Sequence, residues 1–334
     1  MTKASSRSVS ADFIKSISIF GAVFVHSFGI LCNLSGFDID MTYTFRFCVP
    51  AFIALWAYFL EISYSRKNKS ERLIYLKYRF IHLFRIYFIW SLIYFITIAQ
   101  WQVSFVKNIT MYFAGFGFAG QYFFLLLFQL LILHPFLRVL YLKRALRLIT
   151  ISIILLVYIL YGYYQHLLPN LLLKIGERLF LFWIPSVFLG IAMVHGKIIK
   201  IPLMMSLSIL LIPIECYILK RYNLNHFTHI TPVVLISSIL FCISIMQNEH
   251  LIKTVILKLM KHETLTYISS NSILIFVLNP MLCAFFLQFN FSNYFNFSYV
   301  ENIILGSIVA ITIMFFCLVI GEFFRKIGLG KIVF

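Results

Sequence analysis

Residues 301–323 read ENIILGSIVAITIMFFCLVIGEF, an almost unbroken apolar run with its two carboxylates, Glu301 and Glu322, near its ends. A bilayer core of about 30 Å needs roughly 20 such residues in an α-helix. The run therefore predicts a membrane-spanning helix. Nine further apolar runs of similar kind bring the expected total to about ten. The ten runs cover about 14–34, 43–64, 80–98, 119–140, 148–165, 178–195, 201–219, 230–247, 266–288 and 301–323.

The composition of the 334 residues supports this interpretation. Hydrophobic residues make up 62% of the chain and charged residues only 12%. Soluble globular domains carry about 25% charged residues, so this chain could not cover its surface in water. Soluble enzymes, disordered proteins and disulfide-stapled secreted domains are excluded. We expect one all-α domain over residues 1–334, a polytopic membrane helical bundle.

The loop charges predict the orientation of the bundle. Placing the N-terminus in the cytoplasm leaves 22 of the 28 lysines and arginines in the inner loops. Inner loops of membrane proteins carry such an excess, so both termini are expected to be cytoplasmic. The six basic residues on the outer side are Arg46, Lys107, Lys174, Arg178, Lys220 and Arg221.

The net charge of +17 would suggest a nucleic-acid partner in a soluble chain. Here the positive inner loops account for it, and a basic inner surface also attracts anionic ligands. We expect membrane lipids and no nucleic acid as partners. The six cysteines lie in apolar stretches without CxxC spacing, and no HExxH motif occurs, so neither a disulfide framework nor a metal site is expected.

Lys15 and His26 are the most informative polar residues inside the expected spans. They are eleven residues apart, which returns within roughly 20° of the same helix face over about 16 Å. A pocket running from the cytoplasm to His26 would be lined by both. Ordinary structural explanations exist: His26 as a hydrogen-bonded core histidine, and Lys15 as an interfacial anchor.

Other charged residues extend this candidate site. Arg46 lies a few residues inside the second expected span. Arg79, His82 and Arg85 enter the third at three-residue intervals and form a slowly drifting stripe. The stripe suits either lipid phosphates or an anionic ligand, and the depth of Arg85 favours the ligand. Glu215 is expected to be the one carboxylate well inside a span, as a hydrogen-bonded group near the outer end.

Several segments resemble the integral-membrane acyltransferase-3 family. They are Asp12–Ser18 followed by His26-Ser27; Arg46 with Val49-Pro50-Ala51-Phe52; Arg79–Tyr87; Gln121–Pro135; and Asn271–Ile273 with Phe276 and Asn279-Pro280. The chain departs from the family pattern at Trp56-Ala57, at His82, and at Asn279, where the family often has histidine. The segments run from residue 12 to residue 280, and the chain is most similar to stand-alone surface-polysaccharide O-acetyltransferases.

The resemblance implies a multi-pass protein of a bacterial cell membrane that transfers an acetyl group from cytoplasmic acetyl-CoA, as co-substrate, to a hydroxyl of a cell-surface or lipid-linked glycan. His26 would be the general base or carry a transient acyl group, and Arg46 would stabilise the oxyanion or hold the acceptor. Lys15, Arg79, His82 and Arg85 would bind the CoA phosphates. Two other hypotheses stay open: a flippase for a glycan intermediate, and a non-catalytic partner of a polysaccharide synthase. Acceptor, acyl chain and oligomeric state are not readable from the sequence.

Overall fold

The computed structural model describes residues 8–31, 41–98, 104–196, 198–224, 229–287 and 299–330, and this part of the chain is helical without strands. Cys32, Lys3, Arg7 and most of the expected outer loop 289–300 lie outside the described residues. The α-helices are α1 (Val9–Leu31), α2 (Cys48–Ser65), α3 (Lys69–Ile98), α4 (Phe105–Phe113), α5 (Tyr122–Leu142), α6 (Arg144–Tyr163), α7 (Asn170–Ile175), α8 (Ile184–His195), α9 (Ile212–Arg221), α10 (Pro232–Gln247), α11 (Glu249–Leu259), α12 (His262–Ser270), α13 (Ser272–Leu287) and α14 (Tyr299–Lys326). The 3-10 helices are η1 (Met41–Phe47), η2 (Gln165–Leu167), η3 (Gly176–Arg178), η4 (Phe180–Trp183) and η5 (Leu203–Leu211).

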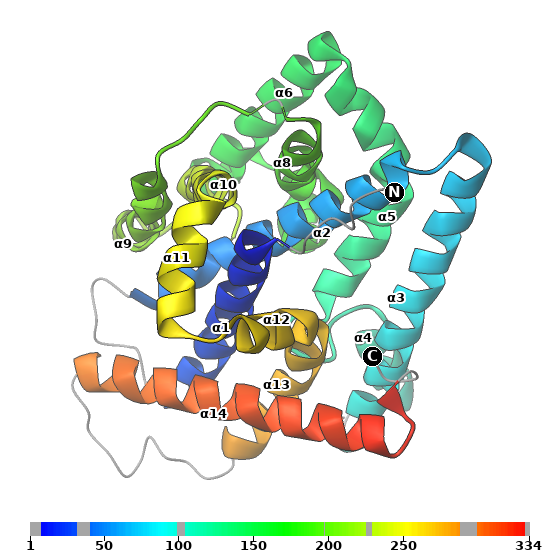
Figure 1. The fold of residues 1–334 in the computed structure, drawn as a ribbon, viewed down its shortest axis with the longest axis vertical. Helices are drawn as coiled ribbons and strands as arrows, with labels where there is room; N and C mark the ends of the chain where they lie inside the picture. The colour runs from blue at the N-terminus through cyan, green and yellow to red at the C-terminus, as the bar shows by residue number, and fades with distance from the viewer. Residues whose placement is uncertain are drawn as a thin grey trace.

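The helices form the expected polytopic all-α bundle (Figure 1). Within the described residues, seven helical stretches are long and apolar enough to cross a membrane, or nine if two bent helix pairs each count as one span. The stretch Phe180–His195 is apolar but shorter. Each of the ten expected runs therefore has a helical counterpart.

Three elements differ from the simple spans expected. The run 201–219 is a 3-10 helix, η5, followed by α9, because Pro213 lacks the N–H that would continue an α-helix and crowds the carbonyl of Ile209. The run 230–247 is continued by α11 after a bend of 82°. The run 266–288 is broken between α12 and α13 by a bend of 68° at Asn271.

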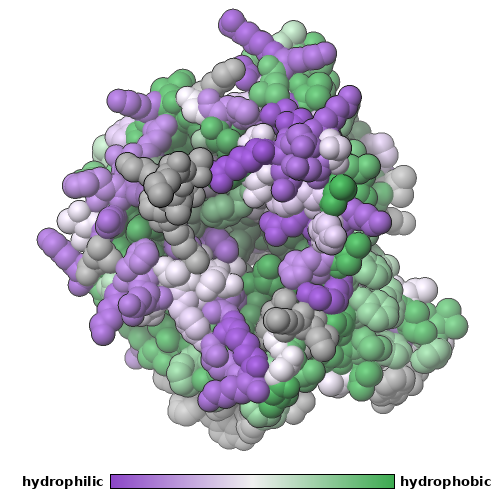
Figure 2. All heavy atoms as spheres, turned by 45° about the vertical axis from the view of Figure 1, so that its right-hand side comes forward, coloured by the Kyte–Doolittle hydropathy of each residue, from purple (hydrophilic) through white to green (hydrophobic). Residues whose placement is uncertain are grey.

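The outer surface carries apolar side chains at helical spacing, as lipid-facing helices require. On α6, Ile149 and Ile153 are each more than half exposed, and on α14 so are Ile304, Ile308 and Phe315. Figure 2 shows hydrophobic side chains over the lower and right-hand parts of one view, whereas hydrophilic side chains gather over much of the rest. The described chain is thus a multi-pass membrane protein.

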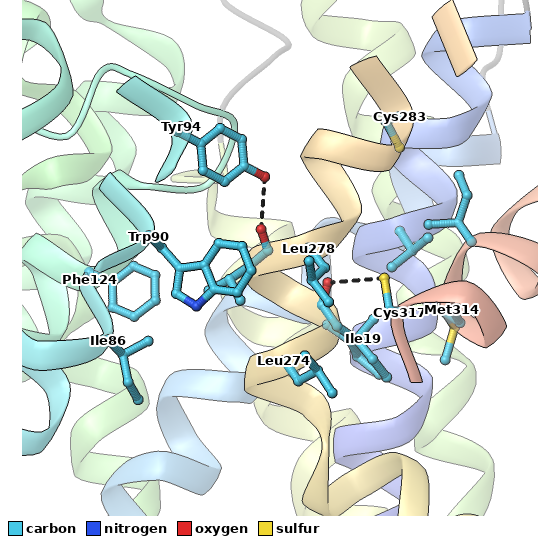
Figure 3. Close-up of a cluster of buried hydrophobic side chains, with 14 of the residues drawn as sticks. Ile19, Ile86, Trp90, Tyr94, Phe124, Leu274, Leu278, Cys283, Met314 and Cys317 are labelled. Atoms are coloured by element: carbon cyan, nitrogen blue, oxygen red, sulfur yellow. Dashed lines mark hydrogen bonds between the residues drawn. The ribbon is translucent and has the colours of Figure 1, made fainter. Parts of the chain in front are cut away.

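Helix α1 lies in the middle of the bundle, where it packs against α2, α12, α13 and α14 (Figure 1). Helix α13 lies between α3 on one side and α1 and α14 on the other (Figure 3). Tyr94 of α3 donates a hydrogen bond to the carbonyl of Val277 at 2.8 Å, and Cys317 of α14 contacts the carbonyl of Ile275 at 4.0 Å. These contacts hold α13 at the centre of a buried aromatic and aliphatic core.

Two glycines allow close approach of neighbouring elements. A Cβ on Gly21 of α1 would lie 2.4 Å from a ring carbon of Phe45, so only glycine admits η1 here. A Cβ on Gly190 of α8 would lie 2.4 Å from the carbonyl oxygen of Ala54 on α2. Such small-residue contacts are the usual means by which membrane helices pack tightly. The Gly21 contact fixes η1, and with it Arg46, relative to α1, and the Gly190 contact fixes α2 against α8.

Candidate active site

A pocket of about 550 Å³ opens among α1, α2, α3, α5 and the α12–α13 bend. Its polar lining consists of Asp12, Lys15, Arg79, Ser270 and Ser272, and its apolar lining of Phe52, Leu55, Trp56, Phe59, Leu83, Phe123, Phe124, Leu127, Ile273 and Phe276. Ser270 and Ser272 both reach the pocket because the helix bends at Asn271. An unbroken helix would run past the pocket. A long ligand with a charged head and a less polar tail suits this lining.

The pocket brings together two of the residues expected from the sequence, Lys15 and Arg79. Lys15 is partly buried on α1, and Arg79 is exposed on α3. Between α1 and the bend lies Asp12, which is 2% exposed and accepts hydrogen bonds from Ser269 at 2.6 Å and Thr266 at 3.4 Å. Asp12 was not among the candidate site residues, and it ties α1 to α12 at the pocket wall.

His82 and Arg85 do not line this pocket. Each step of three residues along the stripe rotates the side chain by about 60° around the helix axis, so His82 and Arg85 face progressively further away from the side of α3 that carries Arg79. Leu83, four residues after Arg79, stays on the pocket face instead. His82 and Arg85 are exposed and bonded to each other, with 3.2 Å between the guanidinium nitrogen and Nδ1.

His26 lies on the C-terminal half of α1 and is held by Asn279 of α13, with Nδ1 and Oδ1 2.6 Å apart. The orientation of Asn279 has a clear cause in Pro280. Proline removes the N–H that would bond the carbonyl of Phe276, and the amide nitrogen of Asn279 donates to that carbonyl at 2.8 Å and to that of Ile275 at 2.9 Å. The amide oxygen is therefore the atom that faces His26.

This arrangement determines the tautomer of His26. An amide oxygen only accepts, so Nδ1 of His26 carries the proton and Nε2 has a free lone pair. A neutral imidazole with a free Nε2 is able to take a proton or to attack a carbonyl carbon. Phe276 lines the pocket, and Asn279 is one helical turn further along α13. His26 itself is not part of the pocket lining.

Arg46 lies in η1, beside the C-terminal half of α1. The preceding residue, Phe45, packs against Phe24 with ring centroids 5.1 Å apart. The side chain of Arg46 is 8% exposed, and its guanidinium stacks 4.4 Å from the centre of the Tyr43 ring. Arg46 is therefore a buried cation on the side of the bundle toward which α1 runs, away from Lys15 and Arg79.

The departures from the family pattern have identifiable places in the fold. Trp56 is part of the pocket wall, and Ala57 packs where Gly190 brings α8 against α2. Asn279, at a position where the family often has histidine, orients His26 through its amide oxygen. His82 is exposed outside the pocket.

Glu215 is not the only carboxylate at depth. It is the expected hydrogen-bonded group, accepting from Tyr163 at 2.6 Å and from the Val233 amide at 3.2 Å. Glu61 of α2 is also fully buried, and it accepts from Arg138 at 2.8 Å. The expectation that Glu215 stands alone is wrong, because Glu61 is fully buried within α2.

The comparisons with known proteins give one match. A family model for an acyltransferase domain, of the acyltransferase-3 type, matches residues 8–322. No curated protein and no solved structure matches the chain. The matched region contains the pocket, the His26–Asn279 pair and every candidate site residue, so the chain belongs to the acyltransferase-3 family and is a membrane acyltransferase.

Proposed function

We propose that the protein is an O-acetyltransferase that moves an acetyl group from cytoplasmic acetyl-CoA to a hydroxyl of a cell-surface or lipid-linked glycan, in a bacterial cell membrane. The observation that carries this proposal is an apolar pocket with Lys15 and Arg79 on its lining that reaches, along α13, to within one helical turn of the Asn279–His26 pair. Its volume of about 550 Å³ lies within the range of about 300–1,000 Å³ typical of small-molecule sites.

The donor fits the two kinds of lining in this pocket. CoA carries several phosphate charges, and Lys15 and Arg79 supply the cations for them. The pantetheine arm is long and weakly polar, which suits walls built from Trp56, Phe124 and Phe276. The thioester would then lie at the deep end of the pocket, near Asn279. His82 and Arg85, exposed on another face of α3, are the weaker candidates for phosphate contact.

His26 supplies the reactive nitrogen in two possible reactions. As a general base, Nε2 takes the proton of the acceptor hydroxyl while its oxygen bonds to the acyl carbon, the carbon–sulfur bond breaks, and the CoA thiolate is protonated. As a nucleophile, Nε2 itself bonds to the acyl carbon and CoA leaves as its thiolate; the acceptor oxygen then displaces the neutral imidazole and loses its proton, and the thiolate gains one to give the CoA thiol. In either reaction, Arg46 would stabilise negative charge on the carbonyl oxygen or hold the acceptor.

The decisive experiment supplies the purified protein with acetyl-CoA labelled in the acetyl group and a membrane glycan fraction. Label should appear on the glycan as an alkali-labile ester, and CoA should be released in equal amount. The His26→Gln variant is the comparison, since it should bind acetyl-CoA and transfer little. Wild-type protein that binds no acetyl-CoA would refute the proposal.

A further inference from the structure

A second oriented histidine, His229, lies outside the pocket described above. It precedes α10, and Glu177 of η3 holds it at two points. One carboxylate oxygen of Glu177 accepts from the backbone N–H of His229, and the other lies 2.9 Å from Nδ1 of the ring. The carboxylate therefore keeps the proton on Nδ1 and leaves Nε2 of His229 as the free nitrogen.

The pair is firmly placed. The carbonyl of Glu177 accepts from Trp183 at 2.7 Å, and its carboxylate also accepts from Tyr122 at 3.4 Å. The side-chain amide of Gln129 holds the same segment through two hydrogen bonds. It donates to the carbonyl of Arg178 at 2.8 Å and accepts from the backbone N–H of Phe180 at 3.1 Å. The His229 and Glu177 side chains remain 26% and 20% exposed, so a ligand is able to reach them.

The helices place His229 near the level of His26. Helices α1 and α10 pack against each other, and Ser10 at the start of α1 bonds the carbonyl of Ile245 near the end of α10 at 2.9 Å. His26 is sixteen residues after Ser10, and His229 is sixteen residues before Ile245. His26 is thus about 24 Å along α1 from this contact, and His229 lies three residues before the start of α10, so both are at the end of the bundle opposite the start of α1. The two rings are also close enough to interact electrostatically.

The two histidines differ in the group that orients them. Asn279 offers His26 a neutral amide oxygen, whereas Glu177 offers His229 a carboxylate. A carboxylate stabilises the imidazolium that forms when Nε2 takes a proton, and a neutral amide does so much less. His229 is therefore the better placed of the two to serve as a proton acceptor.

The surroundings of the pair suit a sugar. The guanidinium of Arg178 lies 4.1 Å from the centre of the Phe116 ring, which is 52% exposed, and 6.0 Å from that of Tyr122. An exposed aromatic face beside a guanidinium and a carboxylate offers both stacking and hydrogen bonds to a ring with several hydroxyls. An acyl-CoA head with its phosphates, by contrast, has its cations at the other end of the bundle.

We infer that Glu177 and His229 form the acceptor-side site, in which Nε2 of His229 takes the proton of a sugar hydroxyl and Glu177 positions the ring. This inference rests on the proposed acetyl transfer. The acceptor oxygen bonds to the acyl carbon as its proton passes to His229, and the bond from that carbon to its carrier breaks, the carrier being the CoA sulfur or Nε2 of His26. The CoA sulfur leaves with the electron pair as a thiolate and takes up a proton, whereas Nε2 of His26 leaves with the electron pair as a neutral imidazole and needs none. With the proton assigned to His229, His26 is free to carry the acyl group.

The test compares two acceptors that differ in their need for a base. The protein is purified in octyl β-D-glucoside, whose sugar hydroxyls and the surrounding water are the hydroxyl acceptors, and CoA release from acetyl-CoA is followed. Hydroxylamine is then added, since it attacks an acyl carbon without a general base. His229→Gln should lower release to hydroxyl acceptors by about 10²-fold or more. Hydroxylamine should restore release to within a few-fold of wild type, and acetyl-CoA binding should be unchanged.

Glu177→Gln should also lower CoA release with hydroxyl acceptors more than with hydroxylamine, but by a smaller factor than His229→Gln. The amide of the variant still accepts from Nδ1 but lacks the charge. The control is His166→Gln, which removes another exposed histidine, three residues after the end of α6, and should match wild type. Equal loss with both acceptors, or no loss in His229→Gln, would overturn the assignment. So would wild-type protein that binds acetyl-CoA and reacts with neither acceptor. Failure of wild type to bind acetyl-CoA would instead count against the proposed function itself.

Discussion

The amide oxygen of Asn279 lies 2.6 Å from Nδ1 of His26, and the amide nitrogen of Asn279 is occupied by carbonyls of its own helix. Pro280 is the cause, because it leaves the Phe276 carbonyl without its helical partner. A structural feature of α13 thus determines which nitrogen of His26 is free. Asn279, one of the residues that depart from the family pattern, is thus the residue that orients the ring of His26.

Replacing Asn279 by leucine should therefore impair turnover more than donor binding. Without the acceptor oxygen, His26 is free to adopt the other tautomer, which has no lone pair on Nε2. We expect turnover to fall by on the order of 10²-fold, with the affinity for acetyl-CoA within a few-fold of wild type. Asn279→Asp is the matched variant, since it keeps an acceptor toward His26 and should retain more activity. Equal turnover in wild type and Asn279→Leu would contradict the orienting role.

Arg79 and Arg85 make a second comparison on one helix. Arg79 lines the pocket and Arg85 does not, although both belong to the same stripe. Arg79→Ala should weaken acetyl-CoA binding by about 10-fold to 100-fold, the worth of a charge-assisted hydrogen bond. Arg85→Ala should weaken it less. Isothermal titration with acetyl-CoA measures both, and a larger loss in Arg85→Ala would show that the phosphates lie elsewhere on α3.

Arg79→Lys should also bind more weakly than wild type, because a compact ammonium cannot make the forked contact that a guanidinium makes to phosphate. Dephospho-CoA is the matched ligand. If Arg79 contacts the phosphate that dephospho-CoA lacks, the wild type and the variants should bind dephospho-CoA with similar affinity.

The sequence predicted the fold class and the places of the helical runs because hydropathy reports burial in lipid directly, although the described residues hold seven to nine stretches long and apolar enough to span a membrane rather than ten. It did not predict helix ends outside the membrane. The third span was expected from residue 80, but α3 starts at Lys69, since polar residues at helical spacing extend a helix into water without an apolar signal. The bend at Asn271 was not predicted for a related reason: the hydropathy of a run does not report the direction in which its helix axis points. The run Ser269-Ser270-Asn271-Ser272 was the available signal.

The candidate site was predictable only in part. Helical geometry placed Lys15 and His26 on one side of α1, and Lys15 does line the pocket. The partner of His26 comes from a helix more than 250 residues away, and such a contact depends on packing that a single sequence does not show. The same holds for Glu177 and His229, which lie in two different connecting segments. Both pairs join residues whose spacing along the chain carries no periodic signal.

Glu61 should be important for stability. Its carboxylate is fully buried and contacts Arg138 at 2.8 Å, His195 at 3.0 Å and His134 at 3.4 Å. Removing one partner of a buried ion pair costs about 3–5 kcal/mol, so Glu61→Ala should lower the thermal unfolding temperature in detergent markedly. The exposed Glu71, changed to alanine, is the control and should have little effect. A Glu61→Ala variant as stable as wild type would show that the cluster does not hold α2, α5 and α8 together.

The orientation of the bundle is testable by labelling. The charge distribution predicts that Asn68, in the turn between α2 and α3, faces the cytoplasm and that His166, after α6, faces outside. Single cysteines at these two exposed positions should react differently with a membrane-impermeant maleimide added to intact cells. The five described native cysteines are buried and should contribute little background. Labelling at position 68 but not at 166 would reverse the assigned orientation, and with it the side from which acetyl-CoA enters.

His26 provides the sharpest separation between a catalytic and a structural role. His26→Gln keeps a side chain of similar reach that is able to hydrogen-bond Asn279, so the variant should fold and insert. Lys15 is eleven residues away, about 16 Å along α1, so acetyl-CoA should still bind. Turnover with hydroxyl acceptors should fall by on the order of 10² to 10⁴, the usual worth of a catalytic base, and hydroxylamine should not restore it if His26 carries the acyl group. This last result contrasts with the rescue expected for His229→Gln, so the two histidines are distinguished by one assay.

Acetyl transfer is measured beside thermal stability in the same detergent. A merely structural histidine would lower stability and leave turnover per folded molecule unchanged, and a folded His26→Gln variant with wild-type turnover would end the catalytic assignment.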